Sequence, residues 1–116
     1  MTRIATALAL AAVAAALAGQ AQAHAALVKA DPAKEASVGA APTINLQFSE
    51  KVEPKFSGAQ LMKANGDNVP VTSKASGNTI VATPKAPLKP GSYMVMWYAV
   101  ADDGHRSNGD YNFTVK

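Results

Sequence analysis

The chain contains no cysteine among its 116 residues. Small exported domains are often held together by disulfide bonds, so a domain without them depends on packing alone. The absence of cysteine also excludes thiolate catalysis and thiolate ligands for a soft metal. Any metal site in this chain must therefore use histidine, carboxylate, methionine or the amino terminus.

The chain also lacks a strong excess of basic or acidic residues. The formal net charge is only +3 at pH 7, and basic and acidic residues are dispersed along the chain. Proteins that bind nucleic acid usually concentrate lysine and arginine in a patch or stripe. The charge pattern therefore gives no indication of nucleic-acid binding.

The one long apolar run lies at the beginning of the chain. The sequence opens with Met1-Thr2-Arg3, continues with small apolar residues over 4–18 and reaches Ala21-Gln22-Ala23. A basic start, an apolar middle and an Ala-x-Ala site are typical of a secretory signal peptide. The run is shorter than the roughly 20 apolar residues of a membrane-spanning helix. We expect residues 1–23 to be a cleaved signal peptide, so that His24 becomes the first residue of the mature protein.

The remaining segment, residues 24–116, is expected to form one domain. Cleavage removes 23 of the 116 residues and leaves 93, and it removes Arg3, so that 10 basic residues face 8 acidic ones and the side-chain charge is +2. A chain of this length can build one modest core and is too short for two.

Apolar residues in this segment recur with period two, which indicates β-strands. Polar and apolar residues alternate clearly in 43–48 and 111–116, and the strongest run covers 93–101. Weaker strand signals lie at 25–29, 60–63, 69–72 and 79–83. No segment predicts a helix. Seven short strands in about 90 residues favour an all-β fold, either a β-sandwich or a small Greek-key β-barrel.

Turn residues separate these predicted strands. Asn65-Gly66-Asp67 and Ser76-Gly77-Asn78 are typical of tight hairpin turns. Tyr93 follows a Pro-Gly corner at the start of the longest strand, which predicts a tyrosine corner, with the hydroxyl bonded back to the preceding backbone. Trp97 shares a face with Tyr93 and is expected at the centre of the core.

Two histidines follow the predicted cleavage site, and His24 would begin the mature chain. An N-terminal histidine offers a free α-amine and the ring Nδ1, which can chelate one metal ion in an arrangement called a histidine brace. The α-amine has a pKa of about 7.7–8.0, so a metal displaces its proton at modest cost near neutral pH. Nitrogen ligands in a flat arrangement suit Cu(II).

His105 is the second candidate ligand, in the run Asp102-Asp103-Gly104-His105 that follows the longest strand. Gly104 permits a tight turn through which Asp103 and His105 can converge on one ion. Together with His24 they would supply three nitrogens and one oxygen, a set appropriate to Cu(II). The alternative is that His105 is an ordinary surface histidine in a common acidic turn.

The mature sequence resembles the CopC family of periplasmic copper-binding proteins over essentially all of residues 24–116. The resemblance rests on a series of motifs: His24-Ala25-x-Leu27, Asp31-Pro32-Ala33, Leu46-x-Phe48-Ser49-Glu50-x-Val52, Leu88-x-Pro90-Gly91-x-Tyr93-x-Val95-x-Trp97, Asp103-Gly104-His105 and Gly109-x-x-x-Phe113-x-Val115.

This resemblance implies a seven-stranded Greek-key β-barrel of immunoglobulin-like type. It implies one Cu(II) ion bound by the amine and ring of His24, the carboxylate of Asp103 and the ring of His105. Glu50 is expected beside the copper, where it would accept a hydrogen bond from a ligand and fix its orientation. A CopD-type inner-membrane copper transporter, or another copper-handling protein, is the implied partner.

The sequence departs from the family pattern in its methionines. Some family members carry a Met-rich loop that binds Cu(I), whereas the corresponding region here, residues 57–68, holds only Met62. We therefore expect no dedicated Cu(I) site. Met94 and Met96 can form a small soft patch, but packing is the simpler interpretation. Asp102 is expected to point away from Asp103. Its charge would make the electrostatic potential at the site more negative, but its carboxylate would not bind the metal.

Three functions remain to be compared. Copper transport, buffering or resistance in the periplasm, without enzymatic activity, follows from the family resemblance. A histidine-brace copper oxidase is the second possibility, but such enzymes need a broad surface with exposed aromatics, and aromatic residues make up only 6% of this chain. A metal-free immunoglobulin-like interaction module is the third, and it rests on the fold alone.

Overall fold

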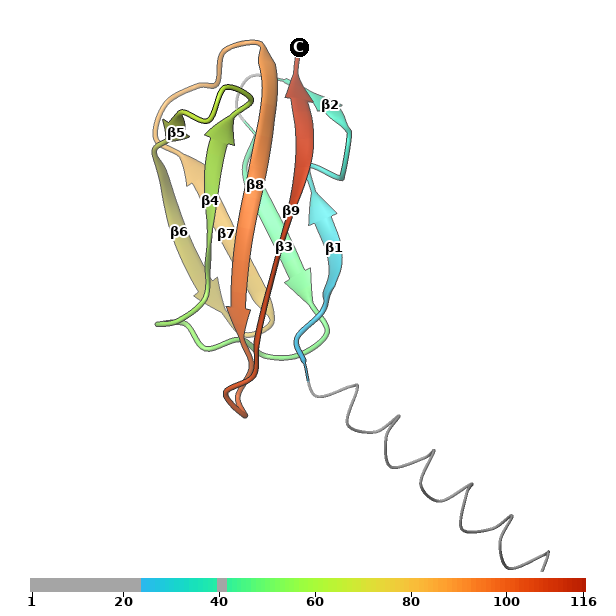
Figure 1. Cartoon of the computed structure of the whole chain (residues 1–116), viewed down its shortest axis with the longest axis vertical. Helices are drawn as coiled ribbons and strands as arrows, with labels where there is room; N and C mark the ends of the chain where they lie inside the picture. Colours follow the sequence, from blue (N-terminus) through green and yellow to red (C-terminus); the bar gives the residue numbers. More distant parts are fainter. Residues whose placement is uncertain (1–23, 40–41) are drawn as a thin grey trace, which may run out of the picture.

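The alternating apolar pattern produces β-strands along the chain, and the computed structural model describes residues 24–39 and 42–116 (Figure 1). The strands are β1 (Leu27–Asp31), β2 (Ser37–Val38), β3 (Ile44–Phe48), β4 (Gly58–Lys63), β5 (Asn68–Val69), β6 (Val71–Ser76), β7 (Thr79–Pro84), β8 (Gly91–Val100) and β9 (Arg106–Val115). The predicted signal peptide lies outside the described residues. Within them, no helix has the length and apolar character required to cross a membrane.

The strands form two sheets packed face to face. One sheet has the order β1-β3-β7-β6, and the other has the order β2-β9-β8-β4-β5. Neighbouring strands are antiparallel except for the short parallel pair β2 and β9. Because the chain crosses between the sheets, strands adjacent in space are often distant in sequence. The predicted all-β, immunoglobulin-like Greek-key fold is confirmed in its two-sheet, sandwich form.

The structure differs from the predicted strands in two places. Residues 69–72 were expected to form one strand, but Pro70 separates β5 from β6, and these two strands belong to different sheets. Proline lacks the N–H that a continuous ladder requires, which explains the break. The two-residue strand β2 was missed because so short a segment cannot show an alternation of polar and apolar residues.

The core lies between the sheets and is built from the inward residues of each strand. Ile44, Leu46 and Phe48 of β3 are at most 1% exposed, and Val95 of β8 is fully buried. Trp97 was expected at the centre of this core, and that prediction was wrong. Its ring is only half-buried and packs edge-on against Phe48, with ring centroids 5.2 Å apart.

The position of Trp97 follows from its partner across the ladder. Gly109 of β9 lies opposite Trp97, and a Cβ at Gly109 would stand 2.6 Å from the indole ring. The ring therefore occupies the space that a side chain on β9 would need. This close approach explains why a glycine lies inside an otherwise regular strand.

Both predicted hairpin turns and the tyrosine corner are confirmed. Gly66 and Gly77 have φ angles of 94° and 58°, in the left-handed region that favours glycine. The hydroxyl of Tyr93 donates to the carbonyl of Lys89 at 2.6 Å, which ties the Pro-rich connection to the start of β8.

Tyr111 presents the opposite case, because its buried hydroxyl has no hydrogen-bond partner among the described residues. Burial, and secondarily the charge of Asp31, raises the pKa of Tyr111 to about 12.

These two tyrosines give a matched test of the fold. Tyr93→Phe should lower the free energy of unfolding by about 1 kcal/mol, because it removes a hydrogen bond and leaves a carbonyl unpaired. Tyr111→Phe should change it by less than about 0.5 kcal/mol, or stabilise the fold, because it removes only an unpaired hydroxyl. Urea unfolding followed by circular dichroism measures both. Equal losses in the two variants would contradict this interpretation.

Candidate metal centre

The hairpin between β8 and β9 lies at one end of the sandwich, at the bottom of Figure 1. The ladder of the two strands runs from the Gly91–Val115 pair to the Val100–Arg106 pair. Beyond it the turn is closed by two backbone hydrogen bonds, from Ala101 N–H to the His105 carbonyl and from Gly104 N–H to the Ala101 carbonyl, each 2.9 Å long. Gly104 has a φ of 88°, which supports the predicted tight turn.

The turn brings Asp103 and His105 into direct contact. One carboxylate oxygen of Asp103 lies 2.6 Å from the ring Nδ1 of His105, and the other accepts the backbone N–H of His105 at 3.1 Å. The backbone N–H, followed by the ring, stabilises the charged carboxylate and holds the pKa of Asp103 below its ordinary value of 3.8.

This contact also assigns the two ring nitrogens of His105. A hydrogen bond between Nδ1 and a carboxylate requires a proton on Nδ1, so Nε2 of the neutral ring keeps a free lone pair. A carboxylate that holds one nitrogen of a histidine in this way is a common support for a metal ligand. The side chains of His105 and Asp103 are 52% and 45% exposed, so an ion can reach them.

His24 lies beside His105, although the two residues are 81 positions apart in the sequence. Their ring centroids are 4.7 Å apart, with an angle of 71° between the ring planes. A small movement of two rings at this distance can place one nitrogen of each on a single ion. The residue pattern alone did not bring the two histidines together, whereas the family resemblance implied it, and the structure places the two rings side by side.

The backbone that follows His24 is fixed by two serines. Ala25 is 1% exposed, and its carbonyl accepts the hydroxyl of Ser107 at 2.6 Å. The N–H of Ala26 donates to the hydroxyl of Ser49 at 2.9 Å, while the N–H of Ser49 donates to the carbonyl of Ala26 at 2.8 Å. These bonds join the chain next to His24 to both neighbouring segments, one of which carries His105.

Sequence reasoning missed the role of both serines. Ser49 stands inside the Phe-Ser-Glu motif, and Ser107 lies two residues after His105, so their positions beside candidate residues were the available signal. Their function depends on a pairing between distant strands, which one sequence does not reveal.

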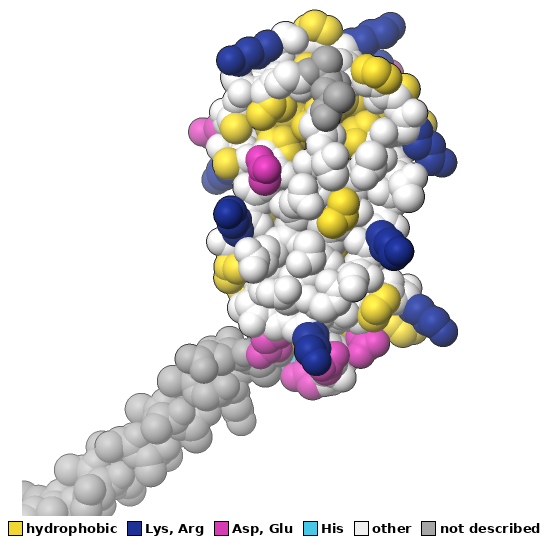
Figure 2. Space-filling model, turned by 180° about the vertical axis from the view of Figure 1, so that it is seen from behind, with side chains coloured by type: hydrophobic (Ala, Val, Ile, Leu, Met, Phe, Trp, Pro, Cys, Tyr) yellow, Lys and Arg dark blue, Asp and Glu magenta, His cyan; other side chains and the backbone are white. Residues whose placement is uncertain are grey.

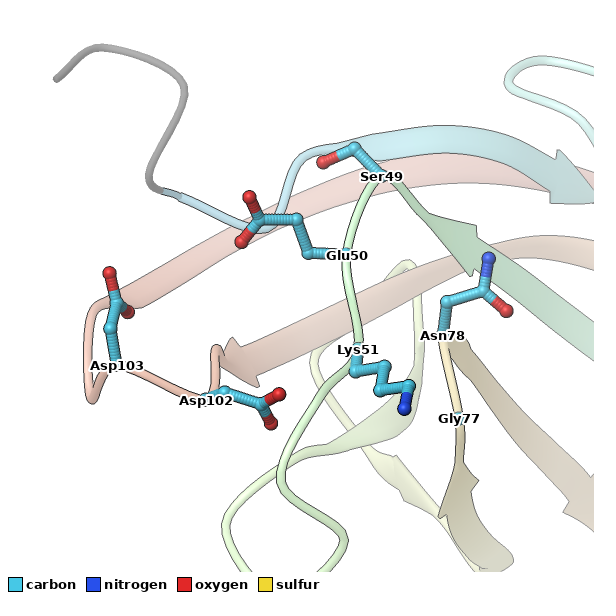
Figure 3. Close-up of a pocket in the computed structure, with 7 residues that line it drawn as sticks. All are labelled: Ser49, Glu50, Lys51, Gly77, Asn78, Asp102 and Asp103. Atoms are coloured by element: carbon cyan, nitrogen blue, oxygen red, sulfur yellow. The ribbon is translucent and has the colours of Figure 1, made fainter. Parts of the chain in front are cut away.

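Glu50 and Asp103 line the same hollow at this end of the molecule. Figure 3 shows their carboxylates directed to one side, whereas the carboxylate of Asp102 is directed toward Lys51. Asp102 therefore points away from Asp103, as expected. Figure 2 shows acidic side chains gathered at this end, which favours a cation.

The described residues do not hold a finished metal site. In residues 24–39 and 42–116, no three histidine, cysteine, aspartate or glutamate side chains are already placed to hold one ion. The nitrogen of His24 is still an amide in the full chain, because it is bonded to residue 23. The donors that are present, imidazole nitrogen and carboxylate oxygen, fit a divalent transition metal of the Cu(II) kind.

Comparison with known proteins points to one family. Residues 27–116 match the family model of the CopC domain. Copper resistance protein C of Xanthomonas campestris pv. juglandis is 40% identical over 103 residues, covering 81% of each chain.

Two solved structures share the fold. PcoC, a methionine-rich copper resistance protein from Escherichia coli, superposes with a TM-score of 0.75 at 37% identity, covering 81% of this chain and all of its own. CopC from Methylosinus trichosporium OB3b superposes with a TM-score of 0.75 at 31% identity, covering 80% and 94%.

The serine anchors generate a prediction. Ser107→Ala should weaken metal binding by about tenfold, the lower end for loss of a residue that supports a ligand, because it frees the carbonyl of Ala25 and lets His24 drift from His105. Competition titration with Cu(II) measures the change, and amide exchange at Ala26 should become faster. Ser92→Ala, at the opposite and exposed end of β8, is the matched control. Equal Cu(II) affinities in the two variants would show that Ser107 does not position His24 for metal binding.

Proposed function

The chain belongs to the CopC family, and from this membership we propose that it binds one Cu(II) ion at the end of the sandwich where His24 meets His105. The observation that carries the proposal is the 4.7 Å separation of the two imidazole rings, with Asp103 in contact with His105. Members of the family are copper-binding and copper-resistance proteins, not enzymes, so this chain is not an enzyme.

Cleavage after residue 23 is a necessary part of the proposal. It converts the amide nitrogen of His24 into an α-amine, which can close a chelate with Nδ1 of the same residue. Nε2 of His105 supplies a third nitrogen, and a carboxylate oxygen of Asp103 supplies the fourth donor. A set of three nitrogens and one oxygen matches the preference of Cu(II) for tetragonal sites.

Asp103 has two ways to contribute to this site. In the present structure its carboxylate is engaged by the ring and the backbone N–H of His105, which orients the ring. Each carboxylate oxygen has a further lone pair, so Asp103 can bind the ion while its contact with the His105 backbone is kept. Because an ion at Nε2 lies on the far side of the ring from Nδ1, the carboxylate would leave Nδ1 when it binds the ion and would support the turn through the backbone N–H of His105 alone.

Glu50 is proposed to act beside the copper without binding it. It is half-buried and lines the same hollow as Asp103, on the segment that Ser49 anchors to the chain after His24. From there its carboxylate can accept a hydrogen bond from a ligand group, such as the α-amine, and fix its direction.

We place this chemistry in the periplasm, where the protein would carry, buffer or sequester copper. The relative from Xanthomonas campestris pv. juglandis is named a copper resistance protein, and the exposed position of His105 suits transfer of an ion to another protein. A CopD-type inner-membrane transporter remains the proposed recipient.

The two competing functions are less well supported. An oxidase of the histidine-brace type needs an open coordination position for oxygen, and Asp103 would occupy one. A metal-free module would have no use for two adjacent histidines at the exposed end of the fold.

Because Asp103 would occupy the position that oxygen needs, the processed protein loaded with copper should form peroxide with ascorbate only at the rate of a simple copper chelate.

The direct test compares two chains in a Cu(II) competition titration. One is the exported chain that begins at His24, and the other carries a single alanine before it. The brace requires the α-amine, so the extended chain should bind at least about a hundredfold more weakly, which corresponds to about 2.7 kcal/mol. His105→Ala, in the chain that begins at His24, is the companion variant and should also weaken binding. Equal affinity in the extended and processed chains would contradict the brace.

A further inference from the structure

The segment that carries Glu50 lies against a hairpin turn that offers no candidate ligand. Gly77 and Asn78 form this turn between β6 and β7, and Figure 3 shows them beside the segment 49–51. Gly77, Asn78 and Glu50 line the same hollow as Asp103. The turn therefore lies close to the candidate metal centre, although the function proposed above does not use it.

Asn78 contacts both backbone groups of Phe48, the last residue of β3. The N–H of Phe48 donates to the carbonyl of Asn78 at 2.8 Å, and the side-chain amide of Asn78 donates to the carbonyl of Phe48 at 3.1 Å. The N–H of Val52 donates to the carbonyl of Gly77 at 2.9 Å. The turn thus holds the backbone on both sides of Glu50.

Only one of these three bonds depends on the side chain at position 78. The other two use the carbonyls of residues 77 and 78, which every residue at these positions has. The carbonyl of Phe48 can only accept, so it requires the amide nitrogen of Asn78. An alanine at position 78 would keep the two backbone bonds and would leave this carbonyl without its side-chain donor.

Ser49 transmits this constraint to the amino-terminal segment. It follows Phe48 directly, its N–H donates to the carbonyl of Ala26 at 2.8 Å, and its hydroxyl accepts the N–H of Ala26 at 2.9 Å. Ala26 is two residues after His24. A continuous series of contacts therefore leads from Asn78, through the backbone of residues 48 and 49, to the chain that places the first histidine.

We propose that Asn78 is a positioning residue of the metal centre. Its amide fixes the carbonyl of Phe48, and the peptide that joins Phe48 to Ser49 then sets the position of the Glu50 carboxylate and of the backbone after His24. Asn78 acts through this backbone and supplies no donor to the ion. Its importance for copper rests on the proposed Cu(II) site, whereas the contacts that define its role are present without metal.

Asn78→Ala and Tyr93→Phe form a matched pair for the test. Each removes one side-chain donor to a backbone carbonyl, but Tyr93 lies at the end of β8 that is remote from His105. In chains that begin at His24, Asn78→Ala should lower the Cu(II) affinity by about tenfold, the lower end for loss of a residue that supports a ligand. It should also change the hyperfine splitting in the electron paramagnetic resonance spectrum of the bound Cu(II). Tyr93→Phe should change neither.

Urea unfolding of the two variants shows how much stability each has lost. A Cu(II) affinity and a spectrum of Asn78→Ala that equal those of the parent chain would overturn the proposal. Equal changes in Tyr93→Phe would overturn it as well, because the effect would then follow from lost stability and not from the position of the donors.

A second measurement needs no metal, so it decides the role of Asn78 independently of the Cu(II) site. In the metal-free chain that begins at His24, Asn78→Ala should make amide exchange at Ala26 faster and weaken the nuclear Overhauser effects between the rings of His24 and His105. Unchanged exchange and unchanged ring contacts would overturn the proposal. Failure of the Cu(II) function is recognised differently, by equal Cu(II) affinities of the parent chain and the chain extended by one alanine.

Discussion

The hydrogen bonds that anchor Ala25 and Ala26 are the constraint on which the candidate site depends. Without them, the segment after His24 would be the loose end of an edge strand. Ser107 and Ser49 bind this backbone from two sides, and each stands near another candidate residue, His105 or Glu50. The bonds that hold Ala25 and Ala26, just before β1, therefore decide where a metal bound by His24 can lie.

This constraint connects the fold to the proposed chemistry. The β8–β9 ladder is long and regular, so it holds the turn with Asp103 and His105 in a fixed position. The core between the sheets keeps β1 and β3 beside that turn. The β8–β9 hairpin and the segment that leads into β1 thus meet at one end of the molecule. Both have a fixed backbone there, so only the donor side chains need to move to bind an ion. Removal of residues 1–23 would add the one donor that the full chain lacks.

Strand β8 links the core of the sandwich to the candidate metal centre. Its inward residues, among them Tyr93 and Val95, build the core, and its outward residues include Met94 and Met96. Its end leads into the turn with His105. The packing that fixes β8 between its neighbours therefore also fixes the position of the turn that carries the donors.

Much of this arrangement was predictable from the sequence. Period-two alternation predicted most strands, and glycine and proline positions predicted the turns and the tyrosine corner. The pairing of distant strands was not predictable from one sequence, and this limit explains what was missed. The depth of Trp97 depends on Gly109 across the ladder, and the anchoring of the chain after His24 depends on Ser107.

The central claim is that processing completes a Cu(II) site made of His24 and His105. Pulsed electron paramagnetic resonance of the Cu(II)-loaded chain that begins at His24 tests it most directly. We expect modulation from the remote nitrogens of two imidazoles and a signal from a directly bound amine nitrogen, with the amine signal absent when one residue precedes His24. A spectrum with a single imidazole, or one that is identical in the extended chain, would contradict the claim.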